Sequence, residues 1–276
     1  MKLIKLHIIY TTKVSLILGI LLWGAFQINI RTPKPLFTVS MQDIAINIDK
    51  NILLIFNLGL KRMISSMMWV QTMLDSDIEH YKKRDLNSWI YLRFDTITSM
   101  DPDFFWAYYI GAQYLSVIKD DVIGAKHLYE KGLKRFPDNF WLNYHAAFNY
   151  YWELRDCKRA YELYSKIQYH PIALKKAIYL PALTARMKFC QGNRKTTFKL
   201  IHTAWLQAPP KTRLKKRLHE YLYSIRAEED LNCLNNQKQT GCHTTDLNNN
   251  PYILDKNGKW TAMQKWNPFK IKFREK

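Results

Sequence analysis

A unit of about 35 residues recurs between residues 85 and 209, and this repetition constrains the fold more than any other feature. Its copies end at Pro102, Pro137, Pro171 and Pro209, at intervals of 35, 34 and 38 residues. Each of the last three prolines follows, at matching distances, a small residue, an aromatic or aliphatic residue and a second small or aliphatic residue. These triplets are Ala125, Tyr129 and Gly132, then Ala160, Tyr164 and Ile167, then Thr197, Ile201 and Ala204. Because small residues let helices approach closely while aromatic residues fill the remaining space, the pattern predicts an all-α fold of repeated helix pairs.

The triplets resemble the second helix of a tetratricopeptide repeat (TPR). The first helix of that repeat has a counterpart in residues 110–114, which read Ile-Gly-Ala-Gln-Tyr. The later copies are degenerate, with Tyr144, Ala147 and Tyr151 beside an unexpected Phe148, and then Ala185 and Lys188. The resemblance implies a right-handed helical solenoid, a fold that binds other proteins and rarely catalyses reactions. An irregular helical bundle with coincidental prolines is the alternative.

Residues 14–30 form an uncharged stretch, VSLILGILLWGAFQINI. At about 1.5 Å per residue, a helix of this length reaches across most of a bilayer core of about 30 Å. Lys2, Lys5 and Lys13 precede the stretch and Arg31 and Lys34 follow it, a slight bias that places the N-terminus in the cytoplasm. A cleaved signal peptide is the alternative, but no small-x-small cleavage site follows the apolar run. The sequence therefore predicts a cytoplasmic stub and an uncleaved transmembrane helix in residues 1–31.

The cysteines form two candidate disulfide pairs. Cys233 and Cys242 bracket a polar stretch with the composition of an exposed loop, and closing so short a loop needs little rearrangement. The repeat register places Cys157 near the start of one second helix and Cys190 near the end of the next first helix, and these helices are antiparallel neighbours. Two bridges would indicate an oxidising compartment, whereas reduced, partly buried thiols are the alternative.

The remaining boundaries follow from the repeats. Residues 32–52 are predicted as a linker, residues 53–235 as the helical solenoid with its capping helix, and residues 236–276 as a C-terminal loop and hairpin tail. Residues 53–81 are expected to form the first helix of the solenoid. Its apolar residues at helical spacing favour a core position over a flexible binding surface. They are Met63, Met67, Met68, Val70, Met73 and Leu74.

An amphipathic helix at residues 211–234 is expected to cap the solenoid, with Leu214, Leu218, Tyr221, Leu222 and Ile225 on its apolar side. Binding of its basic side to a membrane surface is the alternative. In the tail, residues 252–254 and 259–260 flank a turn that ends in Gly258, which predicts a small β-hairpin. Trp260, Trp266 and Phe269 are expected to anchor this tail on the last helices.

The formal net charge of +19 raises the question of a polyanionic partner. The lysines are scattered through the helices, and Ile, Asn and Tyr are abundant as well, as an AT-rich genome would produce. This distribution favours compositional bias over a dedicated surface for nucleic acid or anionic lipid.

The TPR resemblance also implies a partner-binding groove lined by the first helices of successive repeats. Carried over residue by residue, it assigns the groove to Phe105, Tyr108, Leu115, His145, Asn149, Trp152, Arg186 and Phe189. Three of these side chains, His145, Asn149 and Arg186, offer polar groups for an acidic peptide or a terminal carboxylate. The lysine and paired asparagines of the carboxylate-clamp TPR proteins have no counterpart, so that specificity is not assigned. Packing between repeats, or a solvated position, is the alternative for each residue.

The chain carries no Walker loop, Gly-x-Ser-x-Gly, His-Glu-x-x-His or Gly-x-Gly-x-x-Gly motif. No catalytic residue, cofactor or metal site is therefore predicted, and the protein is not expected to be an enzyme. Cys242 and His243 lie near Asp246, but a loop cysteine with a disulfide partner does not need a nucleophilic role.

The order of elements, from N-terminal anchor through repeats to the YILDKNGKW tail, resembles membrane-anchored TPR proteins of proteobacteria. That resemblance implies a single-pass protein of the bacterial inner membrane with its bulk in the periplasm, and no known reaction. The predicted function is a protein-interaction scaffold for membrane or periplasmic partners within a larger envelope assembly. The alternatives are a basic solenoid that binds nucleic acid or anionic lipid, with nucleic acid not expected, and a structural accessory subunit of a membrane protein complex.

Overall fold

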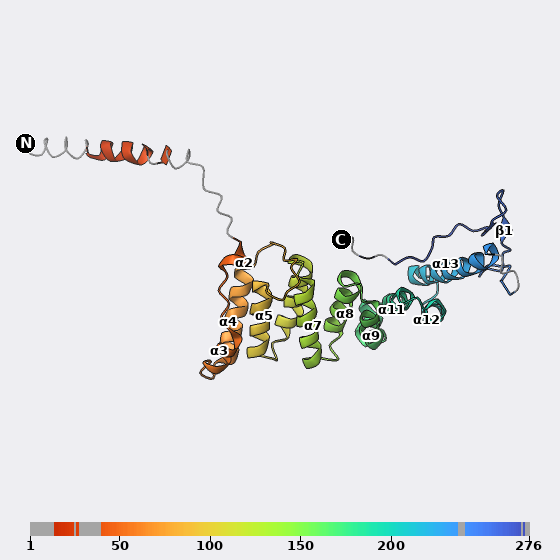
Figure 1. Cartoon of the computed structure of the whole chain (residues 1–276), viewed down its shortest axis with the longest axis horizontal. Helices are drawn as coiled ribbons and strands as arrows, with labels where there is room; N and C mark the ends of the chain where they lie inside the picture. The colour runs from red at the N-terminus through yellow and green to blue at the C-terminus, as the bar shows by residue number, and fades with distance from the viewer. Residues whose placement is uncertain (1–13, 25, 28–39, 237–240, 272, 274–276) are drawn as a thin grey trace, which may run out of the picture. The chain divides into compact units, whose positions relative to one another are not determined.

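Helices make up most of the computed structural model, which describes residues 14–24, 26–27, 40–236, 241–271 and 273 (Figure 1). This composition confirms the all-α class. The chain divides into two compact units, Met1–Ile44 and Ala45–Lys276. The second unit therefore begins within the stretch predicted as a linker, because helix α3 (Lys50–Ile55) already packs against a later helix of that unit.

The first unit contains helical residues 14–24 and 26–27 and the short helix α2 (Met41–Ile44). Among the described residues, no helix combines the length and the apolar character needed to cross a bilayer. The predicted anchor and its stub include residues 1–13, 25 and 28–31, which lie outside the described residues, as does most of the linker. The anchor therefore stays a prediction.

The second unit is a succession of helices that pack in pairs along the chain. After α3 come α4 (Lys61–Leu74), α5 (Trp89–Met100), α6 (Phe105–Gln113), α7 (Val122–Arg135), α8 (Phe140–Phe148), α9 (Cys157–Ile167), α10 (Pro171–Lys176), α11 (Leu180–Cys190), α12 (Arg194–Gln207) and α13 (Arg213–Asn235). Helices that pack closely on each other are α4 and α5, α6 and α7, α8 and α9, α9 and α11, and α11 and α12. Figure 1 shows α4, α5 and α7 standing side by side.

The pairs α6–α7 and α8–α9 repeat one another in detail. Each first helix ends in a π-helical turn, η1 (Tyr114–Ile118) or η2 (Asn149–Glu153). A residue with positive φ then reverses the chain, Asp120 at 57° and Arg155 at 58°. The next residue, Asp121 or Asp156, accepts a hydrogen bond from a backbone N–H three positions later and caps the second helix.

The triplets predicted from the sequence are buried in all three copies. Gly132 shows why small residues are needed, since a Cβ atom at this position would lie 2.9 Å from Cβ of Tyr108. Helix α7 therefore approaches α6 at a distance that a larger residue would not allow.

The third pair departs from this pattern because the short helix α10 is inserted before α11. Pro171 and Pro181 lie in the first turns of α10 and α11, where a missing N–H costs nothing. Pro171 therefore begins a helix, whereas Pro102 and Pro137 follow the ends of α5 and α7. The added helix accounts for the longer interval of 38 residues before Pro209.

The single first helix predicted over residues 53–81 is wrong. The chain forms α3 and α4 with a break between them, where Leu58 has a φ of 50° and Gly59 a φ of 80°. Left-handed backbone at two successive residues ends the helix. Helix α4 then stops at Leu74, and no helix lies between it and α5.

The predicted core position of the α4 apolar residues is wrong for four of the six. Met63, Met67, Val70 and Leu74 are exposed, whereas Met68 and Met73 are half-buried. The opposite side of α4 packs on α5 through polar and aromatic groups, among them Ser65, Trp69 and Thr72. The Ser65 hydroxyl donates to the carbonyl of Ile97 over 3.3 Å, and the Trp69 ring lies 5.8 Å from that of Phe94.

All four cysteines form disulfides, in the two pairings that the sequence suggests. The Cα atoms of Cys157 and Cys190 are 6.0 Å apart and join α9 to the end of α11. Those of Cys233 and Cys242 are 5.7 Å apart and join the last turn of α13 to the segment that follows it.

The tail forms the predicted hairpin, with β1 (Ile253–Leu254) antiparallel to β2 (Trp260–Thr261). Gly258 in the turn has a φ of 72°. Of the predicted anchors, Phe269 is buried against Phe189 and Tyr221, whereas Trp260 and Trp266 are half-buried. The tail therefore packs back onto α11 and α13.

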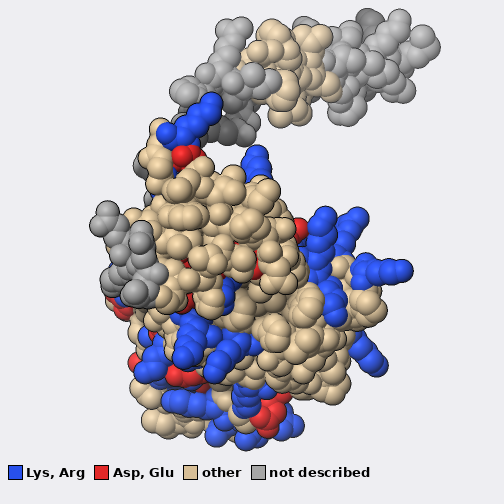
Figure 2. All heavy atoms as spheres, turned by 90° about the vertical axis from the view of Figure 1, so that its right-hand side faces the viewer, with Lys and Arg blue, Asp and Glu red and all other residues tan. Residues whose placement is uncertain are grey.

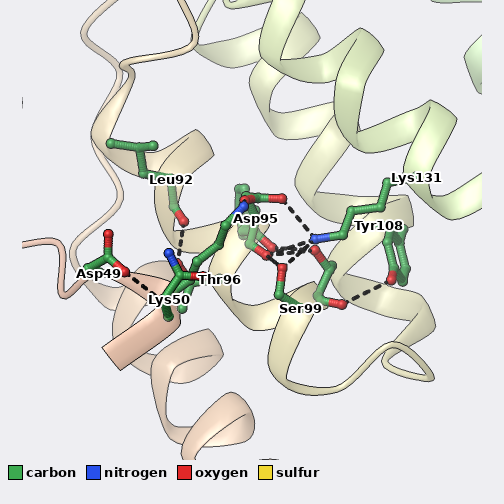
Figure 3. Close-up of polar contacts among 11 residues, drawn as sticks. Asp49, Lys50, Leu92, Asp95, Thr96, Ser99, Tyr108 and Lys131 are labelled. Carbon is green, nitrogen blue, oxygen red and sulfur yellow. Dashed lines mark hydrogen bonds and ion pairs between the residues drawn. The ribbon is translucent and has the colours of Figure 1, made fainter. Parts of the chain in front are cut away.

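A polar network ties α3, α5 and α7 together (Figure 3). The Lys131 ammonium donates to the Asp95 carbonyl, to Oδ1 of Asp95 and to the Ser99 hydroxyl over 2.9, 2.8 and 2.7 Å. Lys50 donates to the other carboxylate oxygen of Asp95 over 2.7 Å. Burial by itself would raise the pKa of Asp95, but hydrogen bonds and charge from Lys131 and Lys50 outweigh it and lower the pKa.

Candidate functional site

A set of aromatic side chains forms a partly exposed surface on α6, α8 and η2. We call it the aromatic surface; it consists of Phe105, Trp106, Tyr109, Trp141, Tyr144, His145, Phe148 and Trp152. Trp106 is 56% exposed and Phe148 is 36% exposed, while the others are half-buried. Large aromatic groups that remain accessible in a cluster mark a surface on which a partner can gain substantial burial.

Ring contacts make this surface continuous from α6 to α8. Phe105 stacks on Tyr109 with centroids 5.6 Å apart, and Tyr109 meets His145 edge-on at 5.4 Å. The His145 ring lies 6.2 Å from Trp141. The rings therefore support one another, so the surface is held in place before any partner binds.

Hydrogen bonds between aromatic residues fix the orientation of the rings. The Tyr109 hydroxyl lies 3.3 Å from Nε2 of His145. The Tyr144 hydroxyl lies 2.8 Å from the hydroxyl of Tyr179, the residue that caps α11. These contacts extend the ordered region from the second helix pair to the start of the third.

The aromatic surface is uncharged at neutral pH. Burial lowers the pKa of His145, so its imidazole is neutral there. Burial, followed by the hydrogen bond to Tyr179, raises the pKa of Tyr144 and keeps its hydroxyl protonated. Such a surface offers apolar area with a few fixed hydrogen-bonding groups.

The sequence contains a signal for this surface that the TPR register does not use. Phe105, Trp106 and Tyr109 recur 35 residues later as Phe140, Trp141 and Tyr144. The phenylalanine and tyrosine of each motif are four residues apart and lie near each other on a helix, and the 35-residue offset places the two copies on equivalent faces. A search for repeated aromatic residues would have found Trp106, Tyr109, Trp141 and Tyr144.

The structure brings three of the predicted groove residues, Phe105, His145 and Trp152, into the aromatic surface. The assignment of Tyr108, Leu115 and Asn149 to a groove is wrong, because all three are buried.

Tyr108 and Asn149 each have a structural role. Tyr108 packs against Gly132, and its hydroxyl donates to the Thr98 carbonyl over 3.2 Å. Asn149 begins η2, where the wider turn changes which side chains face inward, and it accepts from Ser116 over 2.9 Å.

The last two predicted groove residues, Arg186 and Phe189, lie on α11 and contact the tail of the same chain. The rings of Phe189 and Phe269 are 4.8 Å apart and perpendicular within a few degrees, at 86°. The Arg186 guanidinium lies between two rings, 4.8 Å from Tyr221 and 5.6 Å from Phe269. The tail therefore covers part of the face that the TPR register assigns to a ligand.

A second accessible surface is the stripe of Met63, Met67, Val70 and Leu74 on α4, which we call the α4 stripe. These residues stand at intervals of four, three and four, so they lie along one side of the helix. Exposed apolar residues continue beyond both ends of α4, at Leu60 and Ile78. In the described part of the unit no helix covers them.

No family model and no curated protein sequence matches this chain. The aromatic surface and the α4 stripe are therefore the features from which a function can be inferred. Among the described residues, no group of His, Cys, Asp and Glu side chains has the arrangement of a metal site.

Proposed function

We propose that this chain is a protein-interaction scaffold, a right-handed TPR-like solenoid that binds segments of partner proteins through its aromatic surface. The observation that carries the proposal is the recurrence of accessible aromatic residues at equivalent positions of α6 and α8. Tryptophan and tyrosine contribute large contact areas at little entropic cost and are enriched among residues that dominate binding energy. The matching π-helical turns and caps support the repeat.

We propose further that residues 14–30 anchor the chain in the bacterial inner membrane, with the second unit in the periplasm. Two disulfides support an oxidising compartment. The lysines before the apolar stretch support a cytoplasmic N-terminus. Confinement near the membrane would raise the effective concentration of the aromatic surface toward membrane partners and increase the occupancy of weak contacts.

A structural accessory subunit of a membrane protein complex is the second candidate function. The α4 stripe favours it, because a helix that buries serine and threonine while exposing methionine, valine and leucine has its apolar side available for another chain. In that case the partner would be permanent, whereas the aromatic surface would serve transient partners.

The test of the scaffold function is site-specific photo-crosslinking in cells. A photoreactive phenylalanine analogue would replace Trp106 or, as a matched control, Leu206, which is 59% exposed on α12. We expect discrete crosslinked products at position 106 and none at position 206. Products should also form with the analogue at position 109. They should disappear from that position in the double variant Trp106→Ala/Phe148→Ala, which should keep its thermal midpoint of unfolding within a few degrees.

Equal crosslinking at positions 106 and 206, or retention of the products in the double variant, would contradict the proposal. Detergent purification separates the second candidate. A subunit would co-purify with its complex at fixed stoichiometry, and Met67→Asp should release it while Leu206→Asp should not.

The location is tested by thiol labelling with a membrane-impermeant maleimide. In spheroplasts, the native chain should be labelled only after reduction, whereas Cys233→Ser, which frees Cys242, should be labelled without reductant. Labelling that needs membrane lysis but no reductant would overturn the periplasmic placement.

A further inference from the structure

A pocket of about 340 Å³ lies between α11 and α13, and one of its walls, Tyr179, is the hydrogen-bond partner of Tyr144 in the aromatic surface. Its walls combine arginine, aromatic and aliphatic side chains. They come from Ile178, Tyr179, Ala182, Leu183, Arg186, Arg213, Leu214, Arg217 and Tyr221. The volume falls at the lower end of the range of small-molecule sites.

The pocket is cationic, and its arginines have no carboxylate partner. No acidic residue lines it. Among the ion pairs of the described residues, none includes Arg186, Arg213 or Arg217. Arg213 and Arg217 are four positions apart on α13, so like charges share one side of the helix. An anion bound here would relieve their repulsion.

Arg186 is held in place and is incompletely satisfied. Its Nη2 donates to the Tyr221 hydroxyl over 2.5 Å, and two aromatic rings flank its guanidinium. Its Nε is buried and has no hydrogen-bond partner. A buried donor without an acceptor is costly, and a guanidinium fork matches the oxygens of carboxylate and phosphate groups.

Figure 2 views the end of the second unit that carries α13, where lysine and arginine side chains gather and acidic side chains are sparse. Two exposed lysines near the pocket do not line it. Lys211 precedes α13 and Lys216 lies within it. This surrounding charge would attract an anion toward the pocket, while the three arginines would bind it.

A second, more apolar pocket of about 240 Å³ adjoins the first. The two share Ile178, Ala182 and Leu214 as walls. Its rim includes Leu174, which is 61% exposed. A ligand that fills both pockets therefore needs an anionic group and an apolar portion side by side.

The shared wall favours a hydrocarbon chain over a peptide. A peptide running from the arginines into the apolar pocket would carry backbone N–H groups past Ile178, Ala182 and Leu214, whose side chains offer no acceptor. The nearby hydroxyls of Tyr179 and Tyr221 each use part of their hydrogen-bonding capacity on Tyr144 and Arg186. Unpaired amide groups would cost binding energy, whereas methylene groups would gain free energy on burial.

We propose that this double pocket binds an anionic amphiphile, with its oxyanion group against Arg186, Arg213 and Arg217 and its hydrocarbon chain in the adjoining apolar pocket. The site is independent of the scaffold function. A carboxylate and a phosphate head share the required chemistry, so both a free fatty acid and a phospholipid fragment fit it.

The experiment measures binding of soluble amphiphiles to the full chain by titration calorimetry below their micelle concentrations. The probes are dodecyl phosphate and dodecanoate, with inorganic phosphate and dodecanol as the headgroup and the chain alone. We expect both amphiphiles to bind at least about 30-fold more tightly than inorganic phosphate or dodecanol. The stronger of the two probes distinguishes a phosphate source from a fatty-acid source.

Matched variants locate the site. Arg213→Gln/Arg217→Gln should weaken dodecyl phosphate binding by at least about 10-fold, whereas Lys211→Gln/Lys216→Gln, with the same change of charge, should weaken it less than about 3-fold. Leu174→Asp should weaken it, and Leu206→Asp, at a similarly exposed position, should not. All variants lie at accessible positions, and circular dichroism would check that they remain folded.

Equal losses in the two charge-matched pairs would overturn the proposal in favour of diffuse attraction. Binding of inorganic phosphate as tight as that of dodecyl phosphate would overturn it too, because the hydrocarbon chain of the probe would then contribute nothing to binding. Tighter binding of a hexapeptide with a C-terminal leucine carboxylate than of either amphiphile would reassign the pocket to peptide termini.

Discussion

Helices α7 and α4 each span 14 residues, but they turn opposite kinds of residue inward. Helix α7 buries its apolar residues, including Val122, Ala125, Leu128, Tyr129 and Leu133. Helix α4 buries Ser65 and Thr72 and exposes the α4 stripe. An amphipathic pattern thus predicts that a helix has an apolar side, but it does not say whether the same chain covers that side. The difference indicates that α7 is a component of the core, whereas the apolar side of α4 is left uncovered by the described residues.

The largest difference between α7 and α4 is expected when the same substitution, leucine to alanine, is made on each helix. Leu128→Ala on α7, where the side chain is 1% exposed, should lower the free energy of unfolding by about 2–5 kcal/mol. Leu74→Ala on α4, where the side chain is 80% exposed, should change it by less than about 0.5 kcal/mol. Urea unfolding followed by circular dichroism measures both. Similar losses in the two variants would show that α4 has a covered apolar side.

A second substitution tests the ion pair between Lys131 on α7 and Asp95 on α5. Asp95→Asn removes the charge that Lys131 and Lys50 share, and it should cost about 1–3 kcal/mol. The folded-state pKa of Asp95 is lowered, so its carboxylate stabilises the fold fully above its unfolded pKa of about 3.9. That contribution disappears as the pH falls through the folded-state value.

The difference between native protein and Asp95→Asn should therefore be constant from about pH 5 to 7 and shrink toward pH 3. Urea unfolding across this range provides the measurement. A difference that grew in acid would mean that another group carries the pH dependence.

Gly132→Ala tests how closely α7 packs. Alanine improves helix propensity by about 1 kcal/mol, but its methyl group would press on Cβ of Tyr108, and overpacking costs about 1–3 kcal/mol. The net result should be a loss of up to about 2 kcal/mol in the free energy of unfolding, measured by thermal or urea unfolding. The control is Lys134→Ala, at an exposed position of α7. Gly192→Ala would not serve, because Gly192 has a φ of 79° and alanine would be strained there. A stabilised Gly132→Ala would show that the two helices are farther apart.

Apart from the Leu74→Ala control, the smallest effect is expected from Thr72→Val on α4. The Thr72 hydroxyl donates to the Met68 carbonyl over 2.6 Å, within its own helix. Valine keeps the shape and leaves that carbonyl in the backbone hydrogen-bonding pattern, so the free energy of unfolding should change by less than about 1 kcal/mol. A loss of 2 kcal/mol or more would mean that the buried hydroxyl of Thr72 makes a specific stabilising contribution to the packing of α4.

The sequence by itself determined the helix pairs α6–α7 and α8–α9, the buried triplets, the cysteine pairs and the hairpin. These features depend on spacing along the chain: three and four residues around a helix, about 35 between repeats, and a glycine where a turn needs positive φ. Part of the aromatic surface was predictable for the same reason, because Phe105, Trp106 and Tyr109 recur at the repeat interval.

Only the tertiary structure decided which sides of these helices are covered. Leu58 and Gly59 split the first predicted helix, Ser65 rather than Met67 meets α5, and the π-helical turn at Asn149 brings an apparent groove residue inside. The arginine pocket likewise joins residues of α11 and α13 that lie about 30 positions apart in the chain. The spacing of apolar residues predicts which side of a helix can be buried. Packing against helices from distant parts of the sequence determines which side is buried.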